Sequence, residues 1–296
     1  MPTGFAYLTV VLVWATTPLA IKWSAEALPP VMAAMLRMML AVMIGIPCLW
    51  LLRQRLRWDR LAVRAYAAAL PGVFGAMALS YMASRYVPSG LISVVFGLAP
   101  LLSGVMMQFT AASVRLNAWH WSGCLLGVAG LAVVFSDAMT VADGMLAGLL
   151  LLLAAVTGFS ISGVMVKQVA VGMHPLAQTM GALTLSLPCY ALLSVCLGEQ
   201  VVLGDNLSGL VAIGYLAVFG SLVGFVSYFV ILSRLSAATV ALVTLVTPVL
   251  ALALGALFNG ERLPLMALLG AGIILVALAL YLLGDRRVRR LAPVGT

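Results

Sequence analysis

Long apolar runs are the feature of this sequence that most constrains its fold. About 20 consecutive apolar residues are the length at which an α-helix crosses the hydrocarbon core of a bilayer. Lipid requires every backbone polar group to be satisfied internally, and the runs lack the polar alternation of barrel strands, so we expect helices. The sequence predicts an all-α integral membrane protein with ten transmembrane helices. They lie at roughly 4–23, 30–52, 65–84, 88–111, 119–136, 144–166, 175–197, 209–232, 236–258 and 264–284.

The composition excludes a water-soluble fold. Of the 296 residues, 64% are hydrophobic and 8% are charged, whereas soluble domains have about 45–50% apolar and about 25% charged residues. The net charge of +8 comes from basic residues in short connections between the runs, and not from one polar face, which argues against a nucleic-acid partner. We therefore expect the lipid bilayer to surround most of the chain.

The distribution of basic residues predicts the orientation. With a cytoplasmic N-terminus, the inner connections hold twelve Lys and Arg residues, and the outer connections hold three, Lys22, Arg85 and Arg262. This bias satisfies the positive-inside rule, so both termini should be cytoplasmic. The first run lacks a basic leader and a small-residue cleavage site, so we interpret it as the first span and not as a signal peptide.

The two halves of the chain share an ordered set of residues. The matches are Lys22 and Pro30 with Lys167 and Pro175, Gly72 and Pro100 with Gly220 and Pro248, and Arg115, Leu116 and Gly123 with Arg262, Leu263 and Gly270, at offsets of 145 to 148 residues. Because each half has five spans, an odd number, the second half must enter the membrane from the opposite side. Inverted repeats of this kind occur in secondary transporters, where the halves rock about a midplane site. We expect repeats at 1–137 and 138–285 around a central cavity, followed by a basic cytoplasmic tail at 286–296.

Several short motifs carry a family resemblance that covers nearly the whole chain. They are the first span from Val13 to Lys22, Leu28-Pro29-Pro30 followed by Arg37, Leu98 to Leu102, Thr247-Pro248-Val249 and Gly260-Glu261-Arg262-Leu263. In this order they resemble the drug/metabolite transporter superfamily, specifically its bacterial members with two EamA-type domains. The resemblance implies a carrier of the bacterial inner membrane that exports amino acids or other small metabolites.

Family resemblance does not choose a substrate, because similar folds carry different functions. Nucleobases, sugars and drugs stay open, as does a non-transporting scaffold or signalling protein. The spans offer no nucleophile with its base, carboxylate pair or metal cluster, so we expect no enzyme, cofactor or metal site. Stripes of small residues would serve either a homodimer or internal packing, and the sequence does not choose between these.

Arg37 is the sharpest candidate for a substrate contact. It lies about two turns inside the second span, where a charge costs at least ~2.5 kcal/mol unless it faces a cavity or a partner. Its planar fork would match a substrate carboxylate, and the alternatives are that it binds helix-end carbonyls or snorkels outward. Lys22 and Lys167 are repeat-related and stand at span ends, where either ordinary snorkelling or a gate-side role explains them.

Other site candidates are aromatic, hydroxyl or proline residues within the spans. An aromatic and hydroxyl lining would suit amphipathic solutes, and a proline leaves the carbonyl four residues earlier without its helical donor. Interface anchoring, core packing or fixed kinks are the structural alternatives. The expected substrate-binding residues are Trp14, Thr17, Arg37, Tyr81, Phe96, Phe159, Tyr228 and Thr244, and the expected gating or hinge residues are Pro18, Lys22, Pro100, Lys167 and Pro248.

All eight acidic residues fall in connections or at span ends. Proton-driven carriers often titrate an intramembrane carboxylate. The sequence therefore predicts facilitated efflux or exchange, with proton coupling as the alternative.

Overall fold

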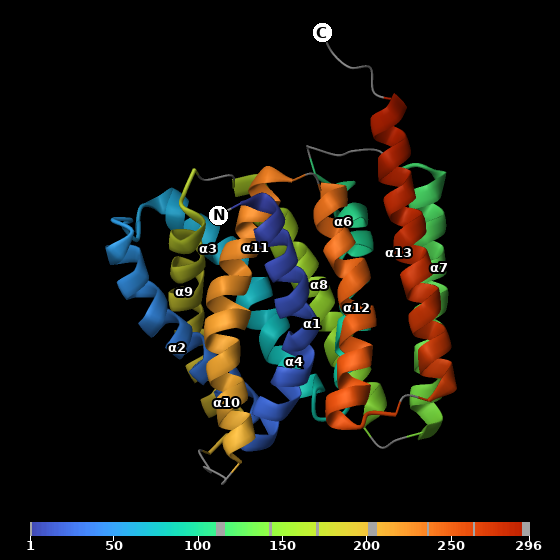
Figure 1. The fold of residues 1–296 in the computed structure, drawn as a ribbon, viewed down its shortest axis with the longest axis horizontal. Helices are drawn as coiled ribbons and strands as arrows, with labels where there is room; N and C mark the ends of the chain where they lie inside the picture. Colours follow the sequence, from blue (N-terminus) through green and yellow to red (C-terminus); the bar gives the residue numbers. More distant parts are fainter. Residues whose placement is uncertain are drawn as a thin grey trace.

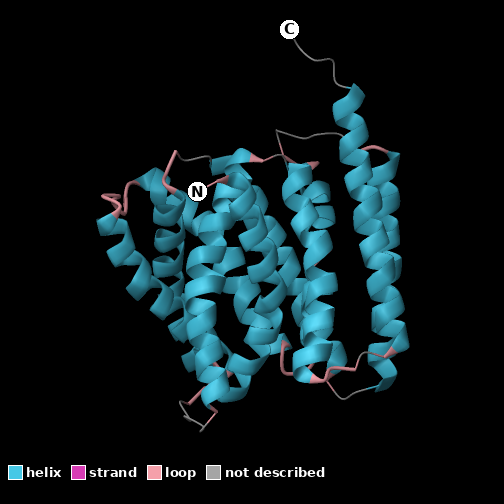
Figure 2. Cartoon of the chain, in the orientation of Figure 1, coloured by secondary structure: helices cyan, strands magenta, loops and turns pink. Residues whose placement is uncertain are grey.

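The computed structural model describes residues 2–110, 116–141, 144–169, 172–200, 206–235, 237–262 and 264–291. The regular elements in these ranges are all helices (Figure 2). Their bounds are α1 Thr3–Ala27, α2 Pro30–Leu51, α3 Arg60–Leu70, η1 Pro71–Ala76, α4 Met77–Ala83, α5 Ser89–Phe96, α6 Ala99–Met107, α7 Ala118–Val141, α8 Met145–Val169, α9 Pro175–Cys196, α10 Leu207–Tyr215, η2 Leu216–Val223, α11 Gly224–Arg234, α12 Ala237–Asn259 and α13 Leu265–Leu291. Arg115, Leu263 and residues 292–296 of the tail, which the sequence analysis used, lie outside the described residues.

The helices account for the ten predicted spans. Nine stretches within the described residues are long and apolar enough to cross a membrane, and Val243–Asn259 is a shorter apolar helix within α12. Three spans are composite, because α3, η1 and α4 follow one another, as do α5 and α6, and α10, η2 and α11. The prediction of an all-α membrane protein with ten helices in two repeats is confirmed.

Helix pairing shows how the two halves combine. The second span of one half packs on that of the other, α2 on α9, and the same holds for α5 on α12 and α7 on α13. Helix α1 packs on α10 and α11, whereas α8 packs on α3, η1 and α4, which is the corresponding arrangement with the halves exchanged. Such a pattern is typical of two inverted repeats related by a pseudo-two-fold axis. The start of α1 and the end of α13, which are the helices nearest the two termini, lie at the same end of the bundle (Figure 1).

Helices α7 and α13 run side by side at one edge of the bundle (Figure 1). Glycines allow their backbones to approach closely. A Cβ atom at Gly270 would lie 2.7 Å from the carbonyl oxygen of Gly130, and one at Gly123 would lie 2.7 Å from that of Ala277. Small residues at such contacts are the usual basis of helix association in lipid, where the hydrophobic effect between helices is weak.

Candidate functional site

A cavity lies between the two halves, extending from the middle of the bundle toward the end opposite the termini. Its volume is about 90 Å³, measured as the space that the centres of water molecules can occupy. Spans from both halves contribute to its wall. The lining residues are Trp14, Thr17, Pro18, Ile21, Arg37, Met77, Ser80, Ile92, Ser93, Phe96, Phe159, Gly220, Phe225, Thr244 and Thr247.

Arg37 supplies the charge among these lining residues. Its side chain is 1% exposed. Nε donates a hydrogen bond to Ser221 Oγ at 2.8 Å, whereas the buried Nη1 has no hydrogen-bond partner among the described residues. A buried guanidinium with an unsatisfied N–H group is costly unless an acceptor reaches it. The Arg37 guanidinium therefore has an N–H group whose hydrogen-bonding capacity the described residues leave unused.

The second half holds Arg37 through an irregular stretch of helix. Segment η2 is π-helical, and it carries Ser221 and Gly220 on the side that faces α2. A Cβ atom at Gly220 would lie 2.9 Å from Arg37 Nη2, so glycine leaves the space that the guanidinium occupies. In the first half, η1 is also π-helical and contains the repeat-related Gly72. Short π-helical insertions occur frequently at functional sites.

Aromatic rings form one wall of the cavity. Trp14 contacts Phe159 edge to face, with ring centroids 6.1 Å apart, and its ring lies 5.0 Å from that of Tyr228. Phe96 contacts Phe159 at 5.7 Å. These rings come from α1, α5, α8 and α11, so both halves build the wall. Such a wall can hold the apolar body of a ligand whose polar group is bound by Arg37.

The cavity is also lined by hydroxyl groups that already donate their protons to helix carbonyls. Thr17 Oγ1 donates to the carbonyl of Val13 at 2.6 Å, and Ser80 Oγ donates to that of Ala76 at 2.7 Å. The remaining lone pairs of both oxygens can only accept hydrogen bonds. They are therefore neutral acceptors.

A second cavity of about 40 Å³, by the same measure, lies closer to the end that carries the termini. Its lining includes Gly72, Ser162 and Tyr228. Phe159 and Phe225 line both cavities and so stand between them.

At the end opposite the termini, two glutamates of the second half cap helices of the first half. Glu199 accepts hydrogen bonds from the backbone N–H groups of Val31 and Met32, at 3.1 and 2.9 Å, at the start of α2. Glu261 accepts from the Ser89 N–H at 3.0 Å and the Ser89 hydroxyl at 2.9 Å, at the start of α5. A carboxylate at a helix N-terminus interacts favourably with the helix dipole. These contacts join the two halves.

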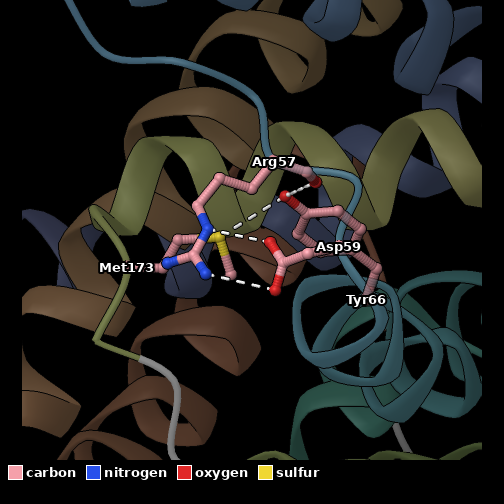
Figure 3. A network of polar contacts seen from close by, with 4 residues as sticks. All are labelled: Arg57, Asp59, Tyr66 and Met173. Carbon is pink, nitrogen blue, oxygen red and sulfur yellow. Dashed lines mark hydrogen bonds and ion pairs between the residues drawn. The ribbon is translucent and has the colours of Figure 1, made fainter.

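A smaller network joins two loops at the end that carries the termini (Figure 3). Tyr66 Oη donates to the Arg57 carbonyl at 2.9 Å and lies 3.4 Å from Met173 Sδ. The Arg57 guanidinium donates to both carboxylate oxygens of Asp59, and this hydrogen bonding lowers the pKa of Asp59 below its ordinary value. Since the pair is exposed to solvent, it contributes little to stability.

Comparison with known proteins identifies the relatives of this chain. The model of the EamA-like transporter family matches residues 2–136 and 146–283. The chain belongs to the EamA-like transporter family. Its likeness to a solved structure, described only as a protein, has a TM-score of 0.67 at 22% identity and covers 96% of this chain and 98% of that one, which concerns the fold alone.

Two curated relatives extend over almost the whole chain. The uncharacterized inner membrane transporter YedA of Escherichia coli (strain K12) is 27% identical over 290 residues, covering 96% of this chain and 92% of the relative. A probable amino-acid metabolite efflux pump of Salmonella typhimurium (strain LT2) is 26% identical over 301 residues, covering 99% of this chain and 98% of the relative. At this modest identity they support membership of a family of membrane transporters.

Within this EamA-like chain, the structure brings together most of the expected substrate-binding residues. Those that line the central cavity are Trp14, Thr17, Arg37, Phe96, Phe159 and Thr244. Tyr228 lines the second cavity and contacts Trp14. Tyr81 lies outside both linings, and its side chain on α4 is fully buried in a core cluster that also includes residues of α2 and α9.

The expected gating residues lie at several different places. Pro18 lines the cavity within α1. Lys22 donates to the Val87 carbonyl at 3.2 Å, and Lys167 is exposed in the last turn of α8. Pro248 lies inside α12, whereas Pro100 is the second residue of α6, just after a break in the fourth span, and does not kink a continuous helix.

Sequence reasoning missed several lining residues. Met77, Ser80, Ile92, Phe225 and Thr247 line the cavity, but none was a predicted contact. Thr247 lies three residues after Thr244 in α12 and therefore on the same helix face, so helical spacing could have identified it. The other four carry no signal that separates a cavity wall from a core.

Proposed function

We propose that this EamA-like protein is a secondary transporter of the bacterial inner membrane that exports amino acids or similar small metabolites by alternating access. The observation that carries the proposal is Arg37, a buried cation in the wall of a cavity between two inverted halves, with Nη1 unsatisfied. A substrate carboxylate would supply both the charge and the acceptor atoms. The aromatic wall would hold the organic body.

Both termini are proposed to face the cytoplasm, following the distribution of basic residues. In this orientation the second cavity lies on the cytoplasmic side of Phe159 and Phe225, and the capping glutamates Glu199 and Glu261 lie on the outer side. Export would then require opening of the contacts around the two phenylalanines, followed by separation of the capped helices. The Salmonella typhimurium relative is named a probable amino-acid metabolite efflux pump, which supports this direction.

Counterflow in proteoliposomes tests the proposal. Vesicles are preloaded with one unlabelled amino acid or small organic acid at a time, and entry of the labelled compound is measured for the wild type and for Arg37→Gln. We expect uptake of one chemical class by the wild type and on the order of a hundredfold less by the variant, because a charge-assisted carboxylate contact is lost. Uptake equal in both proteins would remove Arg37 from the site, and no uptake from any preload would contradict transport of these classes.

A further inference from the structure

The charge at the described wall of the central cavity is of one sign, positive. Among the described residues of its lining, Arg37 is charged and the others are apolar or carry hydroxyl groups. Arginine stays protonated at every working pH, and its fork of N–H donors matches a carboxylate. With Nε bound to Ser221 and Nη1 buried without a partner, the guanidinium places positive charge, and an N–H group that still needs an acceptor, at the wall of the cavity.

An ammonium group in the same cavity would find no anionic partner among the described lining residues, only neutral acceptors such as hydroxyl oxygens and the carbonyl oxygen of Trp14, which Pro18 leaves without its helical donor. Thr17 and Ser80 offer neutral oxygen lone pairs, since both donate their protons to helix carbonyls. Trp14 and Phe159 offer aromatic faces, whose attraction for a cation is modest. In an α-amino acid the ammonium is bonded to the carbon next to the carboxylate, so it would also lie close to the Arg37 guanidinium and be repelled by it in a medium of low dielectric constant. The cavity therefore favours an acid without an ammonium group.

We infer that the preferred substrate is a monoanionic organic acid without an ammonium group, such as a 2-oxo acid with an apolar body, and that it moves as a uniport driven by the membrane potential. This inference rests on the proposed transporter function and, among the amino acids and similar small metabolites of that proposal, places 2-oxo acids ahead of amino acids. The carboxylate binds Arg37, and the apolar body packs on Trp14, Phe96 and Phe159.

The same charge arrangement determines the driving force. Arg37 belongs to the carrier and returns in every cycle, so the net charge moved is that of the substrate, one negative charge per turnover. A potential of 100 mV, negative inside, then favours a monovalent anion outside by about 50-fold at equilibrium. Export of this class needs no titrating carboxylate within the spans, which agrees with the position of all eight acidic residues in connections or at span ends.

Matched pairs of acids test the substrate class. The pairs are pyruvate with alanine, 4-methyl-2-oxopentanoate with leucine, and phenylpyruvate with phenylalanine, each measured by counterflow in proteoliposomes. We expect the 2-oxo acid of at least one pair to exchange about ten times faster than its 2-amino partner. Faster exchange of the amino acids would overturn the inference while leaving the proposed transporter in place. No exchange with any pair would overturn both.

Net flux under an imposed potential tests the driving force. A potassium gradient with valinomycin sets about 60 mV across the vesicle membrane, and the 2-oxo acid should then accumulate about tenfold in the positive compartment. A distribution that does not respond to the potential would overturn the uniport, even if the 2-oxo acid exchanges well.

Variants connect both measurements to Arg37. Arg37→Gln should lose 2-oxo acid exchange, and Ser221→Ala, which keeps the charge but removes the Nε acceptor, should keep potential-driven flux with an apparent affinity several-fold weaker. Arg64→Gln, which removes an exposed cation outside the cavity, is the matched control and should behave as the wild type. Size-exclusion chromatography identifies variants that fail to fold. Loss of potential dependence in folded Ser221→Ala, or unchanged exchange in folded Arg37→Gln, would contradict the assignment.

Discussion

Arg53 has an unusual backbone conformation that the repeat explains. Its φ angle is 54°, in the left-handed region that L-residues with a Cβ atom rarely adopt. It follows α2, where Gln54 N–H donates to the Leu49 carbonyl at 2.9 Å and closes a Schellman-type helix end. The residue 145 positions later is Gly198, with φ of 63° and the equivalent hydrogen bond from Glu199 to Ser194. The second repeat thus has glycine, the residue that the left-handed conformation favours, whereas the first repeat has arginine at the equivalent position.

Replacing Arg53 by glycine should stabilise the protein. The left-handed conformation costs a residue with a Cβ atom about 1–2 kcal/mol, and part of this gain is offset by the larger conformational entropy of glycine in the unfolded chain. We expect Arg53→Gly to raise the free energy of unfolding by roughly 0.5–1 kcal/mol, measured by denaturation in detergent micelles. Arg55→Gly, two residues later in the same loop, is the control and should not stabilise. Equal effects of the two substitutions would show that charge, and not backbone conformation, is responsible.

Gly220→Ala should disturb the position of Arg37. The added Cβ atom would lie 2.9 Å from Nη2, so the guanidinium must move by a few tenths of an ångström or more. Because recognition of a carboxylate by two parallel hydrogen bonds depends on geometry, we expect transport at limiting substrate to fall on the order of tenfold, with folding retained. Gly214→Ala adds a methyl group where nothing lies within 4 Å and is the control for counterflow. Full activity of Gly220→Ala would show that the guanidinium position is not critical.

The elements show where sequence reasoning reaches its limit. Apolar length located the ten spans, because the bilayer imposes that length on every helix. Composition gave no sign of η1 and η2, since a π-helical turn changes the hydrogen-bond register without requiring a particular residue. Arg37 could be predicted as a site residue because a charge inside a span is costly without a partner or a cavity. Its pairing with Ser221 could not be predicted, because it depends on how α2 packs on η2. Tyr81 illustrates the opposite case, an aromatic residue whose burial in the core no local pattern distinguishes from a cavity wall.

Glu261 should stabilise the contact between the two halves at the start of α5. Glu261→Gln keeps the size of the side chain but removes its charge and replaces one carboxylate oxygen by an amide donor, which then faces either the Ser89 N–H or the Gly90 N–H. We expect the free energy of unfolding to fall by about 1–2 kcal/mol, since hydrogen bonds to a charged acceptor at a helix N-terminus are lost. Glu26→Gln changes an exposed carboxylate at the same end and serves as the control for thermal denaturation. Similar effects of the two variants would mean that the cap contributes nothing specific.

At the scale of the whole molecule, a chain of hydrogen bonds joins the two halves at one end of the bundle. At the end opposite the termini, Trp23 donates to Asn259 at 3.0 Å, Asn259 donates to Glu261 at 2.9 Å, and Glu261 caps α5. This chain of contacts crosses from α1 through α12 to α5. Alternating access requires these contacts to separate when the cavity opens at that end.

A disulfide between α5 and α12 should therefore block transport. An ideal Cβ atom at Gly255 lies 3.0 Å from Ser89 Oγ, which is compatible with the short Cβ separation of a disulfide. The Glu261 carboxylate also lies near this Cβ atom, but it is the end of a flexible side chain and can move away. In a background without the four native cysteines, we expect the Ser89→Cys and Gly255→Cys pair to exchange substrate when reduced and to lose nearly all counterflow when oxidised. Each single-cysteine protein should keep its activity under the same oxidant. The decisive comparison is between counterflow and the fraction of cross-linked protein on a non-reducing gel. Activity that persists when all of the protein is cross-linked would mean that α5 and α12 stay together throughout the transport cycle. The two halves would then open elsewhere.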